Sequence, residues 1–295
     1  MKLFYSPRFL EHNTFRHPEC SERLTAIIGF LKKQGFSERD FVEPKPALEE
    51  DVLLVHEQSL LDELKLRSKR LLSVPDNPFN ENTYELALLS AGSAFGAARA
   101  CGKEFAFSLG RPPGHHAGIR TFGGFCYLNN IAFAVRKAQR EGLAKKVLIV
   151  DFDVHLGQGT LEIFQSDSSV FYLSFHQNPN TIYPWQNLGF EGENIKKVDF
   201  LPGARDEEFL RVFKQETLAV AKAFKPDMVA VSAGFDIFFT DSMVGNALEV
   251  RHPETFFEIG KTLKSLKKPC FGVLEGGYDL KVLGENVFNF LKAFI

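Results

Sequence analysis

Val147-Leu-Ile-Val-Asp151-Phe-Asp153-Val-His155 is the most informative run in this sequence of 295 residues. Its first four residues are apolar and mostly β-branched, which is typical of a buried strand. In an extended segment Asp151, Asp153 and His155 share one face, and the two apolar residues between them take the other. Three metal-binding groups at the end of a buried strand are costly to leave without partners. The run therefore predicts a metal site, with hydrogen bonding at the surface as the alternative.

Segments of strand character alternate with segments of helical spacing along the rest of the chain. Helices are expected at Glu22–Lys33, Thr83–Ala100 with Asn82 as N-cap, Asn129–Glu141, Asp206–Phe224 and Val282–Phe294. Strands are expected before Pro7 and at Phe105–Leu109, Val147–Val150, Val170–Phe175, Met228–Ser232 and Phe271–Leu274. This alternation favours an α/β fold with a parallel sheet covered by helices on both faces. Without a visible repeat or long linker, residues 1–295 are expected to form a single domain.

Polar clusters follow three further strands, at the carboxyl ends where such sheets bind ligands. They are Arg111–His116, Ser232–Asp236 and Glu275–Tyr278. Asp236 alone could be a helix cap, but beside the first run it is a candidate third ligand. Two carboxylates and one imidazole leave a coordination position open for water, as catalytic zinc sites require. Oxygen-rich ligation also suits Fe(II) or Mn(II), and this reasoning leaves Asp151 open as a ligand.

The adjacent histidines His115 and His116 stand on a loop stiffened by two prolines. Because imidazole titrates near neutrality, one of them could take a proton from water and return it to a leaving amine. The alternatives are a metal-free polar loop or two additional metal ligands. Tyr278 follows two glycines, where its phenol could donate a hydrogen bond to a developing oxyanion.

Taken together, RPPGHHA, GGFCYLNNIA, VLIVDFDVHLGQGT, VSAGFD and EGGYDL resemble the histone deacetylase family in order and spacing. That family also includes acetylpolyamine amidohydrolases and acetoin-utilisation proteins. The resemblance runs from His17 to the final helix and so covers nearly the whole chain. It implies the arginase/deacetylase fold, in which a central, mainly parallel sheet of about eight strands lies between helices.

The resemblance also implies roles for single residues. The zinc ligands would be Asp153, His155 and Asp236. The catalytic group would consist of His115, His116, Tyr278, Asp151 and Gln158, with His116 as general base and acid. A structural potassium ion would be bound by Asp151, Asp153, His155, Ser174 and Phe175, mainly through backbone oxygens. Asp151 would then support His115 instead of binding zinc.

Substrate contacts implied by the resemblance are Asp76 at the rim, Gly124, Phe125 and Tyr183 in the tunnel wall, and Met243 at a gatekeeper position. An apolar Met243 offers no specific attraction to a cationic polyamine. Two departures lie beside the ligands. Leu156 replaces a histidine that the family usually has, and Gln158 replaces an aspartate or asparagine. Because a neutral amide stabilises imidazolium less than a carboxylate does, we expect a less basic His116.

The resemblance implies zinc-dependent hydrolysis of N-acyl amines, most simply deacetylation of acetylated lysine side chains. Acetylpolyamines, other small N-acyl amines or lysines with longer acyl chains are alternative substrates. A non-catalytic module that binds acyl-lysine is a more distant alternative. A ureohydrolase is also a more distant alternative. Its second metal would need a carboxylate, and the segment Leu156–Gly159 lacks one.

Composition narrows the remaining possibilities. The net charge is −2, from 35 basic and 37 acidic side chains, so no direct binding to nucleic acid is expected. The four cysteines are far apart, which argues against a disulfide framework. No segment has the length of a signal peptide core or a membrane span, so we expect a cytoplasmic protein without membrane contacts. The sequence does not indicate an oligomeric state.

Overall fold

The computed structural model describes residues 1–185, 192–241 and 248–295. In these residues eight strands form one sheet in the order β2-β1-β3-β8-β7-β4-β5-β6, and every neighbouring pair is parallel. The strands are β1 (Lys2–Phe4), β2 (Phe41–Val42), β3 (Ala106–Ser108), β4 (Val147–Asp151), β5 (Val170–Gln177), β6 (Ile195–Phe200), β7 (Met228–Ala233) and β8 (Cys270–Leu274). The predicted parallel sheet of about eight strands is therefore confirmed.

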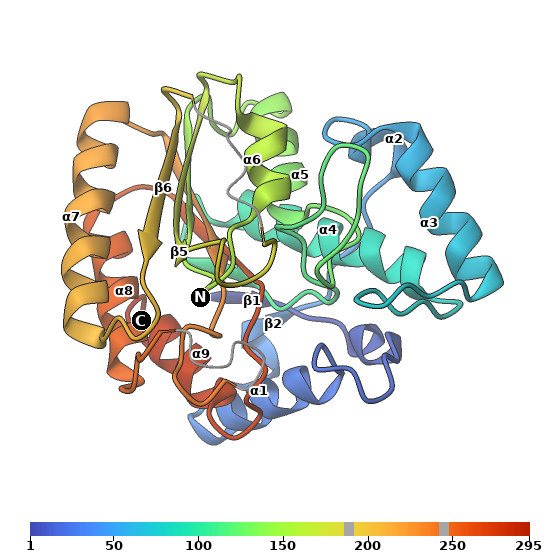
Figure 1. The fold of residues 1–295 in the computed structure, drawn as a ribbon, viewed down its shortest axis with the longest axis horizontal. Coiled ribbons are helices and arrows are strands. Elements are labelled where there is room, and N and C mark those ends of the chain that lie inside the picture. Colours follow the sequence, from blue (N-terminus) through green and yellow to red (C-terminus); the bar gives the residue numbers. More distant parts are fainter. Residues whose placement is uncertain (186–191, 242–247) are drawn as a thin grey trace.

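Helices connect the strands and cover the sheet. They are α1 (Glu22–Lys33), α2 (Glu49–Val52), α3 (Gln58–Arg70), α4 (Thr83–Ala100), α5 (Asn130–Arg140), α6 (Gln158–Phe164), α7 (Asp206–Phe224), α8 (Glu254–Ser265) and α9 (Leu283–Lys292). Short 3₁₀ helices lie at Pro7–Glu11 and Glu38–Asp40. Figure 1 shows α7, α8 and α9 on one side of the sheet and α4, α5 and α6 on the other.

Strand β4 illustrates how both faces of the sheet are buried. Leu148 and Val150 belong to a hydrophobic cluster that includes residues of α1, α7, α8 and α9. Val147 and Ile149 belong to a second cluster, which includes residues of α3, α4, α5 and α6. Alternate residues of the strand thus serve opposite faces, which explains its continuous apolar run. The result is the three-layer arrangement that the sequence predicts.

The bounds of α1, α4 and α7 coincide with the predicted helices, and the predicted strands differ from the observed ones by only a few residues. Asn82 precedes α4 as expected, but its side chain makes no capping hydrogen bond. A side-chain cap occurs instead at α5, where Asn129 accepts a hydrogen bond from the backbone nitrogen of Ala132 at 3.1 Å. Elements that were not predicted are β2, β6, α2, α3, α6 and α8.

Candidate metal centre and acid–base site

The four polar clusters lie at one edge of the sheet because the strands before them are neighbours. β3, β8, β7 and β4 are consecutive in the sheet and parallel, so their carboxyl ends share an edge. The clusters follow in the same order, as Arg111–His116, Glu275–Tyr278, Ser232–Asp236 and Asp151–His155. The topology thus assembles groups that are far apart in the sequence.

Asp153, His155 and Asp236 offer ligand atoms that all lie within 4.8 Å of one another. Oδ2 of Asp236 is buried 3.3 Å from Nδ1 of His155 and has no hydrogen-bond partner among the described residues. A buried carboxylate oxygen without a partner is costly. Two carboxylates and an imidazole match the ligands that zinc and Fe(II) take in proteins. The trio therefore fits a divalent cation.

Electrostatics within the trio point the same way. Burial, together with the charge of Asp153, raises the pKa of Asp236 above its usual range. Burial opposes a charged imidazole, yet the carboxylates of Asp153 and Asp236 raise the pKa of His155 to about 9. Two acids this close repel each other unless a positive charge stands between them. A bound cation would provide that charge and leave the imidazole neutral.

Backbone groups hold the two acids in place. The nitrogen of Gly276 donates to Oδ2 of Asp153 at 2.8 Å, and that of Val154 donates to Oδ1 of Asp236 at 3.1 Å. A Cβ on Gly234 would lie 2.3 Å from Asp153, and a Cβ on Gly276 would lie 2.0 Å from Asp236. Glycine is therefore required at both positions if the carboxylates are to keep these places.

Asp151 stands outside the trio and supports His115. Its Oδ2 lies 3.0 Å from Nδ1 of His115 and accepts a hydrogen bond from the Tyr172 hydroxyl at 2.8 Å. Burial opposes protonation, but Asp153, Asp151 and Glu275 together raise the pKa of His115 to about 10. These acids thus favour the protonated form of His115. The local sequence pattern left Asp151 open as a ligand, whereas the geometry gives it to this histidine.

His116 is held differently. Its Nδ1 lies 2.6 Å from Oε1 of Gln158. A carbonyl oxygen only accepts, so Nδ1 carries the proton and Nε2 keeps a free lone pair. Burial, then the charges of His115 and His155, lower the pKa of His116 well below its usual value. The sequence predicted a less basic His116 because of Gln158, but burial and the two neighbouring imidazoles are the causes, and the hydrogen bond to Gln158 acts to raise the pKa of His116.

The ring of Tyr278 is fixed between two groups. The Arg23 guanidinium lies 4.8 Å from the ring centroid, and Phe125 contacts the ring edge-on at 5.7 Å. The backbone nitrogen of Tyr278 donates to Oδ2 of Asp241 at 2.5 Å. Burial raises the pKa of this phenol well above its usual value, so the hydroxyl remains a neutral donor.

Two buried residues that were assigned no role of their own from the sequence support these loops. Glu275 accepts hydrogen bonds from the backbone nitrogens of Gly114 at 2.8 Å and His115 at 3.2 Å. Arg23 donates to the carbonyl oxygens of Glu275 at 2.5 Å and Gly277 at 2.6 Å. Glu275 was predicted as part of a polar cluster after a buried strand, but its role in holding the histidine loop was not. Arg23 lies in a distant helix and gives no local signal.

A cavity of about 320 Å³ opens beside the trio. The predicted residues in its lining are Asp76, His116, Gly124, Phe125, His155, Tyr183 and Tyr278. Thr181, Ile182 and Trp185 also line it and were not predicted, although Trp185 stands out as the single tryptophan of the sequence. The predicted gatekeeper Met243 lies outside the described residues.

Gly124 allows the cavity wall to pack directly against His116. Its φ is +52°, and a Cβ there would lie 2.5 Å from Cδ2 of His116 and 2.8 Å from Cε1 of Tyr183. Phe125 follows, also with a positive φ of 70°, and its ring contacts His17 edge-on at 4.4 Å. The wall therefore packs directly against the rings of His116 and Tyr183, with no space for a side chain at position 124.

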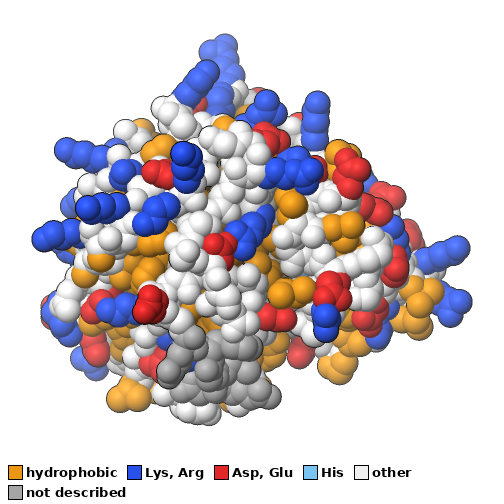
Figure 2. All heavy atoms as spheres, turned by 90° about the horizontal axis from the view of Figure 1, so that it is seen from above, with side chains coloured by type: hydrophobic (Ala, Val, Ile, Leu, Met, Phe, Trp, Pro, Cys, Tyr) orange, Lys and Arg blue, Asp and Glu red, His pale blue; other side chains and the backbone are white. Residues whose placement is uncertain are grey.

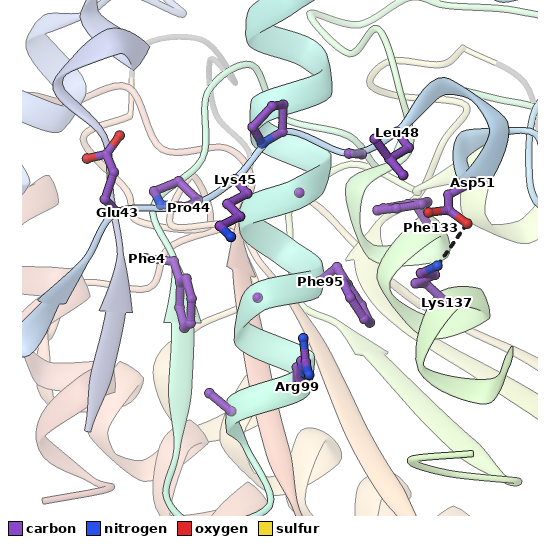
Figure 3. A pocket seen from close by; sticks show the side chains of 15 residues that line it. Phe4, Glu43, Pro44, Lys45, Leu48, Asp51, Phe95, Arg99, Phe133 and Lys137 are labelled. Carbon is purple, nitrogen blue, oxygen red and sulfur yellow. Dashed lines mark hydrogen bonds and ion pairs between the residues drawn. The ribbon is translucent and has the colours of Figure 1, made fainter. Parts of the chain in front are cut away.

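A second cavity, of about 470 Å³, lies beside α4, away from these groups (Figure 3). Phe4, Phe95 and Phe133 supply its apolar lining, and Asp51 is paired there with Lys137 at 2.8 Å. None of the predicted site residues that the structure describes lines it. The smaller cavity beside the metal trio is thus the candidate site.

The residues implied for potassium lie on neighbouring strands. Asp151 on β4 is in register with Ser174 on β5. The Ser174 hydroxyl is 2.8 Å from Nδ1 of His176, and the side chain of Phe175 is in the hydrophobic core. Backbone oxygens are therefore the groups these two residues could offer to a cation, and potassium binding stays a prediction.

Figure 2 shows acidic and basic side chains interspersed on one face of the molecule. Among the described residues, none of the helices combines the length and apolar character that crossing a bilayer requires.

Comparison with known proteins identifies the family. Residues 17–294 match the model of the histone deacetylase domain. A probable deacetylase of Methanothermobacter thermautotrophicus is 37% identical, over 99% of this chain and 90% of that protein. The chloroplastic histone deacetylase 14 of Arabidopsis thaliana is 32% identical, over 100% of this chain and 77% of that protein.

Solved structures agree with this assignment. The HDA15 HD domain superposes with a TM-score of 0.90 at 31% identity, covering 100% of this chain and 90% of the other. The acetylpolyamine aminohydrolase of Burkholderia pseudomallei superposes with a TM-score of 0.88 at 26% identity, covering 100% and 98%. The arrangement of strands and helices is thus shared with both proteins.

Proposed function

The chain belongs to the histone deacetylase family, and we propose that it is a zinc-dependent amide hydrolase that removes acyl groups from amines, residues 1–295 forming one catalytic domain. One observation carries the proposal. The trio of Asp153, His155 and Asp236 lies beside a cavity that also contains an imidazole with a free lone pair, His116, and a neutral phenol, Tyr278. A metal site, a base and an oxyanion donor are the parts that metal-assisted hydrolysis of an amide uses.

Asp153, His155 and Asp236 would hold the metal. Zinc bound there would supply Lewis-acid chemistry, polarising the scissile carbonyl and making water more acidic. Fe(II) would suit the same oxygen-rich set. His115 would stay protonated beside Asp151 and add positive charge near the reacting oxygen.

His116 and Tyr278 would move the proton and stabilise the charge. Nε2 of His116 is free to take a proton from the attacking water and to return it to the leaving amine. Because its pKa is low, His116 is neutral and able to accept a proton at physiological pH. The Tyr278 hydroxyl would donate a hydrogen bond to the carbonyl oxygen as negative charge develops there.

The cavity favours a slender acyl-amine stem. Phe125 and Tyr183 flank the cavity, and Asp76 is the one acid in its described lining. We propose acetylated lysine side chains as the leading substrate, with Asp76 accepting hydrogen bonds from the substrate backbone. Lysines with longer acyl chains are a variant of the same hypothesis.

A second candidate is a small N-acyl amine such as an acetylpolyamine. The structural similarity to an acetylpolyamine aminohydrolase over nearly the whole of both chains favours it. Both candidate substrates would be hydrolysed at the same site. They differ in the part of the substrate that would extend outside the cavity.

A substrate panel tests the proposal. The zinc- and iron-reconstituted protein is given acetyl-lysine peptides, an acyl-length series and acetylpolyamines, and the released carboxylate is measured. Release from any of these that requires added metal supports the proposal. Protein that binds metal and acetyl-lysine peptide but releases no carboxylate would instead support a binding module.

A further inference from the structure

We propose that the Tyr183 hydroxyl is a positioning group that holds the Gln158 amide against His116. The inference rests on the proposed function, in which His116 is the base. It gives Tyr183 a role beyond that of a cavity wall. The role follows from Gln158, the residue that departs from the family pattern behind this histidine.

Three side chains form the arrangement. Oε1 of Gln158 lies 2.6 Å from Nδ1 of His116, and Nε2 of Gln158 donates to the Tyr183 hydroxyl at 3.3 Å. The rings of His116 and Tyr183 contact edge-to-face, with centroids 4.8 Å apart and an interplanar angle of 82°. The amide is therefore bonded at both ends, to the base and to the wall. The phenol keeps its proton, because burial raises the pKa of Tyr183 to about 12.

An amide needs such support more than a carboxylate does. A carboxylate can accept from imidazole through either oxygen and is drawn to it by charge. The amide of Gln158 has one accepting end, at the tip of a side chain with three rotatable torsions. If it swings away or turns over, Nδ1 of His116 loses its acceptor, and Nε2 no longer keeps the lone pair that the reaction needs.

The fold leaves the hydroxyl as the support for this amide. Gln158 is the first residue of α6, and its N-cap, Gly157, has no side chain to hold it. In the described residues the hydrogen-bond partners of the Gln158 side chain are His116 and Tyr183 alone. Because the hydroxyl accepts from the amide nitrogen, it keeps the amide oxygen turned toward Nδ1 of His116.

A double-mutant cycle tests the inference. Tyr183→Phe removes the hydroxyl in the Gln158 protein and in a Gln158→Met background, where a side chain of similar size has no amide. With Gln158 we expect kcat to fall by roughly 2- to 10-fold, the worth of one hydrogen bond, with KM nearly unchanged. In the Gln158→Met background there is no amide to hold, so Tyr183→Phe is expected to change kcat by less than about 2-fold. An equal loss in both backgrounds, or no loss with Gln158, overturns the inference.

NMR supplies a readout that does not depend on turnover. The short contact with Gln158 should give the Nδ1 proton of His116 a slowly exchanging low-field resonance, in metal-free protein as well. Tyr183→Phe should broaden it or shift it, and the matched control Tyr5→Phe, outside the cavity, should not. An unaltered resonance in Tyr183→Phe overturns the inference. If no acyl amine is hydrolysed, the proposed function fails while this measurement still decides the positioning role.

Discussion

Replacing Tyr278 with phenylalanine removes one hydroxyl and leaves its surroundings in place. The contacts of the ring with Arg23 and Phe125 do not involve the hydroxyl, and the bond to Asp241 is made by the backbone nitrogen. No described residue is hydrogen-bonded to the hydroxyl, so its loss leaves no buried group unpaired. The change therefore isolates the role proposed for Tyr278 in stabilising the oxyanion.

The size of the effect follows from that role. One oxyanion donor is typically worth roughly 10²–10³ in kcat, or about 3–4 kcal/mol of transition-state stabilisation. Because the hydrogen bond strengthens as charge develops, kcat should fall while KM changes little. Thermal unfolding should stay within about 2 °C of the parent, as expected for a change below about 0.5 kcal/mol.

The assay is steady-state hydrolysis of an acetyl-lysine peptide by metal-loaded protein, with metal content measured for each variant. Tyr5→Phe is the matched control, since it removes a hydroxyl outside the cavity. Full activity in Tyr278→Phe would refute the assigned role. Loss of activity together with loss of metal or of the folded state would show that the hydroxyl has a structural role and would leave no support for the oxyanion role.

Three further predictions concern the metal, acid stability and the cavity wall. Asp236→Asn should bind less than about one tenth of the parent's zinc at equal free metal, measured by equilibrium dialysis, since it removes a charged ligand; undiminished binding would exclude Asp236 as a ligand. Against burial, Arg111 lowers the pKa of Glu19 from 4.5 to about 2, so the stability this pair contributes is present above pH 4.5 and is lost as pH falls toward 2. Urea unfolding should show that the parent loses about 3 kcal/mol more than Glu19→Gln over this interval, and equal losses would contradict the assignment. Gly124→Ala should lower kcat at least about 10-fold, because its Cβ would meet the His116 ring at 2.5 Å and the backbone there is left-handed; Gly102→Ala, with open space around its Cβ, is the control.

The sequence predicted the sheet well because buried parallel strands are continuous apolar runs. Strong amphipathic periodicity marked α7, and the observed helix has the predicted bounds. β6, with the sequence IKKVDF, was missed because it is an edge strand with partly exposed residues and lacks such a run. β2 is only two residues long, and α3 has a low mean hydropathy, so neither stood out.

The candidate site was predictable only in part. Local spacing gathered Asp151, Asp153 and His155 into one cluster but could not divide them between a metal and His115. That division depends on the loop after β3, which carries His115, reaching the end of β4. Strands β8 and β7 lie between these two strands in the sheet, and the sequence alone does not show this order. The resemblance to a family supplied the division. Neither source pointed to Arg23, which acts on the Glu275–Tyr278 turn from a helix far away in the sequence.

The two departures beside the ligands have different consequences. Leu156 is fully buried in the hydrophobic cluster that includes residues of α4, α5 and α6, together with Tyr172. Leu156 therefore contributes apolar packing where the family usually has a histidine. A histidine there would need a hydrogen-bond partner in an apolar environment. Gln158 instead contacts the base itself, and it is a neutral acceptor where family members with an aspartate have a charged one. Differences between this protein and family members with an acid at that position should thus arise at Gln158, and Tyr183 is the residue through which they can be measured.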